Sequence, residues 1–253
     1  MSRDAFGFIL PFGGDASEFA AMDEKLIETI VEQVMSRLTA ARGSVADAPS
    51  ETDLVTEDIR GGRVLIGVSN RHAHLAPEHV EILFGRGAKL TEMRPLLQPG
   101  EYACDQTMTI VSPAGRCLGP VRILGPARKV SQVELSLSDC YSLGYRKMPP
   151  VRSSGDHSGS FGITLVGPAG SVSLSSGVIR ANRHIHLHTS QAAAMGLKEN
   201  GSADVRINGD RPLILLGFQV RTSPKFRAEI HLDTDDANAA GVRSGDYAQI
   251  LLR

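Results

Sequence analysis

The sequence predicts a mainly β protein with short helices: two similar β-barrel domains that arose by internal duplication, preceded by an N-terminal amphipathic helix on a linker. Three observations support this prediction. Short runs rich in Val, Ile and Leu recur from about residue 63 onward, each closed by Gly, Pro or Ser. The frame NRHxHL occurs twice, a little over a hundred residues apart. Residues 1–62 differ in composition from the rest of the chain.

The N-terminal extension, residues 1–62, is predicted to hold one helix over about residues 22–40, followed by a linker rich in Ser, Asp, Ala and Gly. A lone helix of this length is marginal in water, so its apolar stripe needs a partner surface. That partner is either the chain's own core or another protein, which the linker would allow the helix to reach. Apolar residues fall at helical spacing at Leu26, Ile27, Ile30, Val31, Val34 and Leu38.

The core, residues 63–253, is predicted to consist of two interleaved barrel domains made of many short strands. Examples of these strands are VLIGVS, TMTIVSPAG, PLILLGFQVRT and YAQILLR. Two brief helices follow the His-x-His strands. Pro77 suits the first turn of one helix, and Thr189 or Ser190 suits the N-cap of the other.

The duplication extends beyond the histidine frames. When Gly144 is matched to Gly241 and Asp139 to Asp236, the two copies align, and the same offset places Glu134 on His231. Each copy then contains a His-x-His strand and, later, one further side chain of a type that binds metals. The first copy offers His72, His74 and Glu134; the second offers His184, His186 and His231.

Side chains two apart on a strand point to the same face, so each His-x-His presents two imidazoles together. A third ligand from a neighbouring strand would complete a site with an open position, which is typical of catalytic zinc. If the copies pack face to face, the six side chains form a two-metal site. One centre would hold two imidazoles and a carboxylate, and the other three imidazoles, leaving a positive pocket suited to an anion.

Three arginines accompany these motifs. Arg128 lies six residues before Glu134, so on a regular strand it shares the same face and could bind phosphate or carboxylate through two parallel hydrogen bonds. The alternative is an ordinary surface ion pair. Arg71 and Arg183 alternate away from the histidine face, which indicates packing or support of the ligands.

The remaining histidines are weaker candidates. His188 continues the alternation, yet its counterpart is Ala76, so we expect it not to be a ligand. His79 and His157 lie in polar surroundings and are expected to be solvated. Cys104 is expected to be a small buried thiol.

Composition excludes several classes of function. A net charge of −1 without a long run of Lys or Arg argues against nucleic-acid binding. No apolar run approaches the roughly 18 residues of a membrane span. Three cysteines without Cys-x-x-Cys spacing suggest a reducing compartment. We therefore expect a cytoplasmic protein that binds neither nucleic acid nor membrane. We also expect a homo-oligomer, although no feature of the composition requires it.

The frames GVSNRHAHL, LLQPGEYACDQTMTIVSPAG, VRILGPARKVSQVELS, RANRHIHL and AEIHLDTDDANAAGV occur in order along residues 63–253. In this respect the chain resembles the PduL-type phosphate acyltransferases, the phosphate propanoyltransferases of bacterial microcompartments. The resemblance implies two β-barrels, two Zn²⁺ per chain, and exchange of phosphate and coenzyme A on an acyl group such as propanoyl or acetyl. It implies that the ligands are the six residues named above, and that Arg128 binds phosphate. It also implies that the N-terminal helix is an encapsulation peptide that contacts microcompartment shell or core proteins.

Two alternatives remain at this point. A dinuclear zinc esterase or thioesterase would use the same pocket, but it would cleave acyl-CoA without phosphate. A non-catalytic metal-binding module of the microcompartment would show no activity at all.

Overall fold

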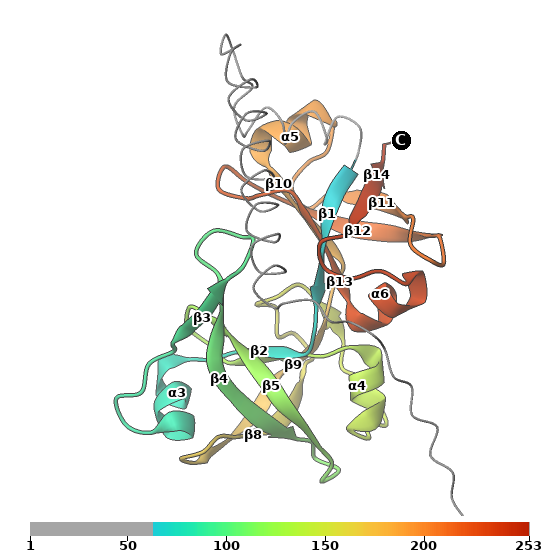
Figure 1. Ribbon diagram of the computed structural model, residues 1–253. Helices are drawn as coiled ribbons and strands as arrows, with labels where there is room; N and C mark the ends of the chain where they lie inside the picture. The colour runs from blue at the N-terminus through green and yellow to red at the C-terminus, as the bar shows by residue number, and fades with distance from the viewer. Residues whose placement is uncertain (1–62, 253) are drawn as a thin grey trace, which may run out of the picture. The chain divides into compact units, whose positions relative to one another are not determined.

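The computed structural model describes residues 63–252, and these residues fold as a mainly β structure with four short helices (Figure 1). The predicted fold class is confirmed in this part of the chain. The predicted N-terminal helix and linker lie outside the described residues. None of the helices within 63–252 has the length and apolar character that crossing a membrane requires.

Six strands form a closed barrel that combines the start of the described chain with its end. β1 pairs in parallel with β13, matching Ile66 to Ile230, and antiparallel with β14, matching Val64 to Ala248. We call it the C-terminal barrel. Its strands are β1 (Arg63–Ser69), β10 (His184–His188), β11 (Ser202–Ile207), β12 (Leu213–Ser223), β13 (Glu229–Asp233) and β14 (Tyr247–Leu251).

A second ring of strands closes through the pairing of β8 with both β4 and β9, and we call it the inserted barrel. Its strands are β2 (His72–His74), β4 (Tyr102–Val111), β5 (Cys117–Gly125), β6 (Gln132–Glu134), β8 (Phe161–Val166) and β9 (Ser171–Ala181). β3 (Glu92–Pro95) extends the sheet at β4, and β7 (Val151–Arg152) extends it at β9. The chain thus leaves β1, completes the inserted barrel, and returns to the first barrel at β10.

The helices are α3 (Pro77–Phe84), α4 (Leu137–Ser142), α5 (Thr189–Ala194) and α6 (Thr234–Ala240). α3 begins at Pro77, as predicted. The predicted cap of α5 is wrong, because the N-cap is His188, whose ring nitrogen accepts a hydrogen bond from the Ser190 backbone N–H. An imidazole nitrogen can replace the hydroxyl oxygen that usually satisfies this first-turn donor.

Each barrel encloses its own hydrophobic core, and side-chain alternation decides which residues enter it. Ile185 and Leu187 of β10 lie in the core of the C-terminal barrel, whereas His184 and His186 point to the other face of the same strand. In the inserted barrel, Ala73 occupies the equivalent core position between the two histidines of β2. Full burial of a side chain such as Ile185 or Leu187 stabilises the folded state by about 1.5–3 kcal/mol.

The histidine faces lie outside both barrels and are nevertheless buried. Both barrels belong to one compact unit. Side chains of one barrel form hydrogen bonds with the other barrel near β2 and β10. Ser153 donates to Gln219 (2.6 Å), and the Ser138 N–H donates to Asp235 (2.8 Å), which joins the first turns of α4 and α6. Packing of one barrel against the other therefore removes the histidine faces from water.

The three cysteines differ sharply in exposure, which generates a prediction. Cys104 and Cys140 are buried, and burial raises the pKa of their thiols to about 11 and about 12, while Cys117 is exposed at the start of β5. Because the thiolate is the reactive form, we expect one thiol per folded chain to react rapidly with Ellman's reagent and all three after denaturation. Replacing Cys117 by Ser should abolish the rapid phase. Rapid labelling of a second thiol would contradict the burial described here.

Candidate metal centre

The first candidate cluster consists of His72, His74 and Glu134, with their ligand atoms within 4.8 Å of one another. β2 supplies both imidazoles, and the antiparallel register with β6 places Glu134 directly opposite His72. The His72 Nε2 lies 3.6 Å from one carboxylate oxygen of Glu134, and the His74 Nε2 lies 3.9 Å from the other. All three side chains are buried.

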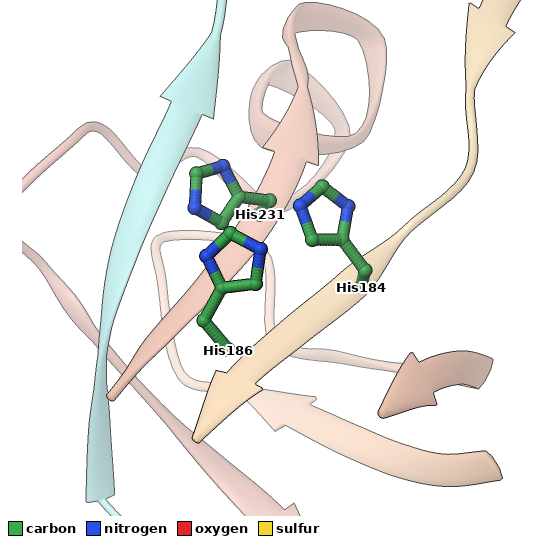
Figure 2. Close-up of side chains that lie close together, drawn as sticks. All are labelled: His184, His186 and His231. Carbon is green, nitrogen blue, oxygen red and sulfur yellow. The ribbon is translucent and has the colours of Figure 1, made fainter. Parts of the chain in front are cut away.

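The second candidate cluster consists of His184, His186 and His231 (Figure 2). The register of β10 with β13 places His231 directly opposite His184, as Glu134 stands opposite His72. The rings of His184 and His231 are stacked with centroids 4.5 Å apart, and His186 lies 4.8–4.9 Å from both. Among residues 63–252, these two clusters are the groups of three or more ligand-type side chains that could hold a metal ion.

Burial favours the uncharged imidazole that a metal ion requires. The pKa of His74 is lowered to about 3 by burial and by the neighbouring His72 and Arg128, and that of His186 is lowered to about 3 by burial and by His231 and Arg221. The pKa of His184 falls well below its ordinary value for the same kinds of reason, burial first.

His72 and Glu134 form a charged pair in the absence of a metal. Burial opposes the charged form of each, but the attraction between them prevails, so the pKa of His72 is raised and that of Glu134 is held far below its usual range. A bound cation would take the place of the imidazole proton in this pair.

Several imidazole nitrogens have the unused hydrogen-bonding capacity that metal ligands need. Within the described chain, His74 Nδ1, His186 Nδ1 and His231 Nε2 are buried without a hydrogen-bond partner. His231 Nε2 does lie 2.9 Å from the Glu229 carboxylate, but without a well-aligned hydrogen bond. Unpaired buried nitrogens are costly, and a metal ion would satisfy those that face it.

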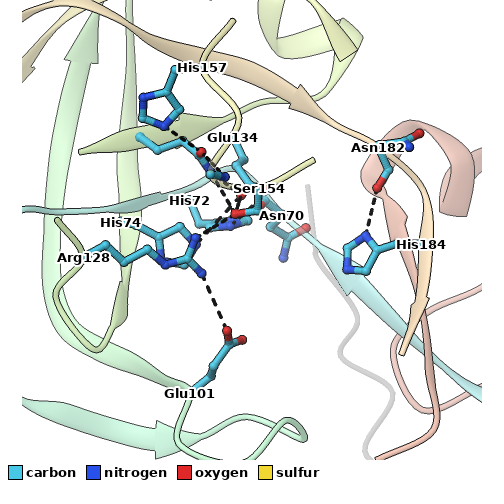
Figure 3. A network of polar contacts seen from close by, with 12 residues as sticks. Asn70, His72, His74, Glu101, Arg128, Glu134, Ser154, His157, Asn182 and His184 are labelled. Carbon is cyan, nitrogen blue, oxygen red and sulfur yellow. Dashed lines mark hydrogen bonds and ion pairs between the residues drawn. The ribbon is translucent and has the colours of Figure 1, made fainter. Parts of the chain in front are cut away.

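Backbone carbonyls fix the orientation of the first histidine in each pair. The Nδ1 of His72 lies 2.8 Å from the Asn70 carbonyl oxygen, and that of His184 lies 2.9 Å from the Asn182 carbonyl oxygen (Figure 3). An N–H donated to a backbone carbonyl leaves Nε2 as the free ligand atom, as is common for metal-binding histidine. The contact uses only the backbone of Asn70 and Asn182, so it fixes the imidazole orientation without accounting for the asparagine side chains.

The donor sets fit zinc, which binds imidazole and carboxylate at about 2.0–2.2 Å. Donors around one such ion lie within about 4 Å of one another. Closing the observed 4.8 Å spacing therefore requires the side chains to move inward by less than about 1 Å.

Arg128 lies beside the first cluster, as expected, but the predicted reason for its position is wrong. It belongs to the loop between β5 and β6, so the argument from strand alternation is wrong. Its Nη1 donates to Ser154 Oγ (2.7 Å), and Ser154 donates in turn to Glu134 (2.6 Å) (Figure 3). Its Nη2 lies 3.6 Å from Glu101. The guanidinium is therefore one hydroxyl away from a candidate metal ligand.

Arg71 and Arg183 support the clusters from behind, as their alternation predicts. Arg71 pairs with Asp139 (2.6 Å) at the start of α4, and Arg183 pairs with Asp236 through two hydrogen bonds (2.5 and 2.8 Å) at the start of α6. These are the two aspartates that the internal alignment matched. Each pair ties the backbone just before a His-x-His strand to the helix that follows the third ligand.

Several residues near the clusters were not foreseen from the sequence. The Gln132 amide donates to Glu134 (2.6 Å). Its side-chain oxygen lies 3.0 Å from the Nε2 of His157, so His157 has a protein partner and is not merely solvated. Glu229 occupies the place equivalent to Gln132 and lies beside His231. A side chain at Gly67 would collide with the Glu229 carboxylate, which explains glycine in β1. The offset that matched Glu134 with His231 could have drawn attention to the Gln132 and Glu229 pair.

Gln98 was also missed. It is buried and comes from the loop between β3 and β4 of the inserted barrel. Its amide donates to Glu229 (2.8 Å) and to the Arg227 carbonyl (3.0 Å), and its oxygen accepts from the Arg227 N–H (3.2 Å). No local pattern marks a glutamine that pairs with a strand so distant in sequence.

The other predictions on single residues have different outcomes: the buried thiol of Cys104 is confirmed, whereas a solvated His79 is wrong. His188 caps α5 and belongs to neither cluster. Cys104 is fully buried. His79 is partly buried, with its Nδ1 2.7 Å from the Ser131 hydroxyl, and so has a structural partner that the sequence did not suggest.

Comparisons with known proteins place this chain in a family. A family model described as phosphate propanoyltransferase matches residues 65–243. A phosphate propanoyltransferase of Thermotoga maritima is 47% identical over 189 residues, covering 74% of this chain and 89% of the relative. One from Rhodopseudomonas palustris is 38% identical over 229 residues, covering 90% of this chain and 98% of the relative. One from Salmonella typhimurium is 46% identical over 188 residues, covering 74% and 88%. The resemblance carried by the sequence motifs is confirmed: the chain belongs to the phosphate propanoyltransferase family and is an acyltransferase.

Proposed function

We propose that this enzyme interconverts acyl-CoA plus phosphate with acyl phosphate plus CoA at a dinuclear zinc site. One zinc ion would be held by His72, His74 and Glu134, and the other by the three histidines of the second cluster. The observation that carries the proposal is the pair of equivalent buried clusters with unpaired imidazole nitrogens. Three protein ligands leave a coordination position open, as in catalytic zinc sites.

Bound zinc would supply Lewis acidity, offsetting the charge of phosphate and polarising a thioester carbonyl. The protein's own contribution is orientation. Arg128 carries a planar guanidinium that matches two oxygens of a phosphate, and Ser154 links it to Glu134. Phosphate bound by Arg128 is thereby held in a fixed position relative to the first cluster, which removes much of the entropic cost of the encounter with acyl-CoA.

We propose direct transfer. A phosphate oxygen attacks the thioester carbonyl carbon, a C–O bond forms and the C–S bond breaks, and sulfur departs with the electron pair. The proton of hydrogen phosphate ends on the CoA thiol. The buried thiols Cys104 and Cys140 are poor nucleophiles because burial raises their pKa to about 11 and about 12, which supports a route without an acylated cysteine.

Propanoyl-CoA and acetyl-CoA are both proposed substrates. They differ by one methylene, and burial of one methylene contributes about 0.8 kcal/mol, a modest discrimination. The names of the relatives favour propanoyl.

We also propose that the enzyme works inside a bacterial microcompartment in the cytoplasm, as a homo-oligomer. Residues 22–40 would serve as an encapsulation peptide that contacts shell or core proteins. The support is the amphipathic pattern of this segment together with the resemblance to microcompartment enzymes.

The test of the proposed reaction is CoA release from propanoyl-CoA by zinc-loaded protein, with and without phosphate. We expect release that depends on phosphate, accompanied by formation of acyl phosphate, which hydroxylamine traps as a hydroxamate. Release without phosphate would indicate the alternative thioesterase. No release from fully metallated protein would indicate the alternative binding module.

Metal content gives a second prediction. We expect one zinc ion per cluster, and His184→Ala should lower the zinc content by about one ion per chain because one of three ligands is lost. The matched control is His188→Ser, on the same strand, which removes an imidazole outside the cluster and keeps a side chain able to cap α5. Mass spectrometry of dialysed protein measures the content. Equal zinc loss in both variants would contradict the assignment.

Arg128 gives a third prediction. Arg128→Ala should lower kcat/KM for phosphate by about 100-fold, because a charged hydrogen-bonded contact contributes about 1.5–3 kcal/mol. The neighbouring exposed residue provides the control: Lys129→Ala should retain activity within about twofold, since mutations of solvated side chains change little. Steady-state rates at varied phosphate measure both. Similar losses of activity in both variants would show that disturbance of the loop, and not loss of the Arg128 guanidinium, lowers the activity.

A further inference from the structure

Arg221 lies on the histidine face of the C-terminal barrel. The parallel register of β12 with β10 places it directly opposite His186. Its neighbour Val220 points into the barrel core, so the arginine points out of the barrel, on the same side as the candidate ligands. Sequence alternation alone did not mark it.

The guanidinium of Arg221 has unused donor capacity. Its Nη2 is buried and, in the described part of the chain, has no hydrogen-bond partner. A buried cation with an unpaired donor is unfavourable unless an anion completes its surroundings. The geometry therefore leaves a place for acceptor atoms next to His186.

The charges that act on Arg221 come from both barrels. Burial lowers its pKa, Arg128 lowers it further, and Glu134, Glu199 and Glu101 oppose that change. Arg128, Glu134 and Glu101 belong to the inserted barrel. Arg221 thus lies within electrostatic range of the first cluster while standing beside the second.

The two barrels differ at the position of this arginine. The offset that matches Glu134 with His231 matches Leu124 with Arg221. Leu124 follows Ile123, which pairs with Ala73, so the equivalent position in the inserted barrel is apolar. The inserted barrel has Arg122 opposite His72, but at the position of Arg221 it has no charge, so Arg221 is a feature of the C-terminal barrel alone.

We propose that Arg221 is a second phosphate-binding residue, which together with Arg128 holds the phosphoryl group of phosphate or acyl phosphate. This inference rests on the proposed function and deepens it. A tetrahedral dianion has enough oxygens to serve two guanidiniums and the open positions of two metal ions. Two arginines from different barrels then bind more of the phosphoryl oxygens than Arg128 alone could bind.

The experiment compares Arg221→Gln with Arg206→Gln, both in zinc-loaded full-length protein. Arg206 is an exposed arginine on the adjacent strand β11 and serves as the control. Rates at varied phosphate should give a KM for phosphate raised by about 10- to 100-fold in Arg221→Gln. The KM for propanoyl-CoA should stay within about twofold, and Arg206→Gln should match the wild type.

A readout independent of turnover is the melting temperature with and without phosphate. Phosphate should raise the Tm of the wild type and of Arg206→Gln, because a ligand that binds the folded state stabilises it. Arg221→Gln should lose this shift. In the absence of phosphate it should melt no lower than the wild type, because the substitution removes the unpaired buried guanidinium.

The outcomes separate this inference from the proposed function. A wild type that releases CoA only with phosphate, together with an Arg221→Gln variant of unchanged phosphate KM and Tm shift, would overturn the role of Arg221 alone. A variant that melts lower and binds both substrates less well would also overturn it, in favour of a structural role. A wild type without phosphate-dependent turnover, whose phosphate-induced Tm shift still requires Arg221, would support the anion site and refute the reaction.

Discussion

Alternation of side chains along two short strands determines most of what this structure can do. In β2 and β10 the residue between the two histidines enters a barrel core, so the histidines must face outward. An outward face is normally wet, and exposed imidazoles would titrate near neutrality. Here the other barrel covers that face, with Gln98 and Ser153 reaching across. Burial keeps the imidazoles of His74 and His186 uncharged. Uncharged ring nitrogens can then bind a cation.

Similarity between the barrels supplies the scaffold, and differences between them supply the chemistry. The third residue of each cluster comes from the same place in both barrels, yet one is Glu134 and the other His231. A metal ion on the first cluster would have a carboxylate among its ligands, whereas the ligands of the second cluster are all uncharged and its nearest carboxylate, Glu229, lies beside His231. Arg221 stands on the side of the uncharged donors, where Leu124 has no charge to offer.

Much of the fold and the membership of both clusters could be predicted from the sequence, because period-two alternation and a constant offset are properties of the sequence itself. Arg128 was placed near Glu134 by assuming a continuous strand, but the chain there forms a loop, and the contact runs through Ser154. Gln98 and Arg221 were missed for a different reason. Their roles arise from packing between segments far apart in sequence, and no local period records such contacts.

The position of β1 has a consequence for how the enzyme is made. This strand is synthesised before the whole inserted barrel, yet its partners β13 and β14 are among the last strands of the described chain. Ile66 therefore cannot pair with Ile230 until β13 has been synthesised. The C-terminal barrel cannot close before that point, so the histidine faces of β2 and β10 cannot be covered by a complete second barrel. A nascent or truncated chain would present half-formed histidine pairs to free metal ions without a second barrel to enclose them. His231 itself lies on β13, so the second candidate cluster is complete only once this late segment has been made.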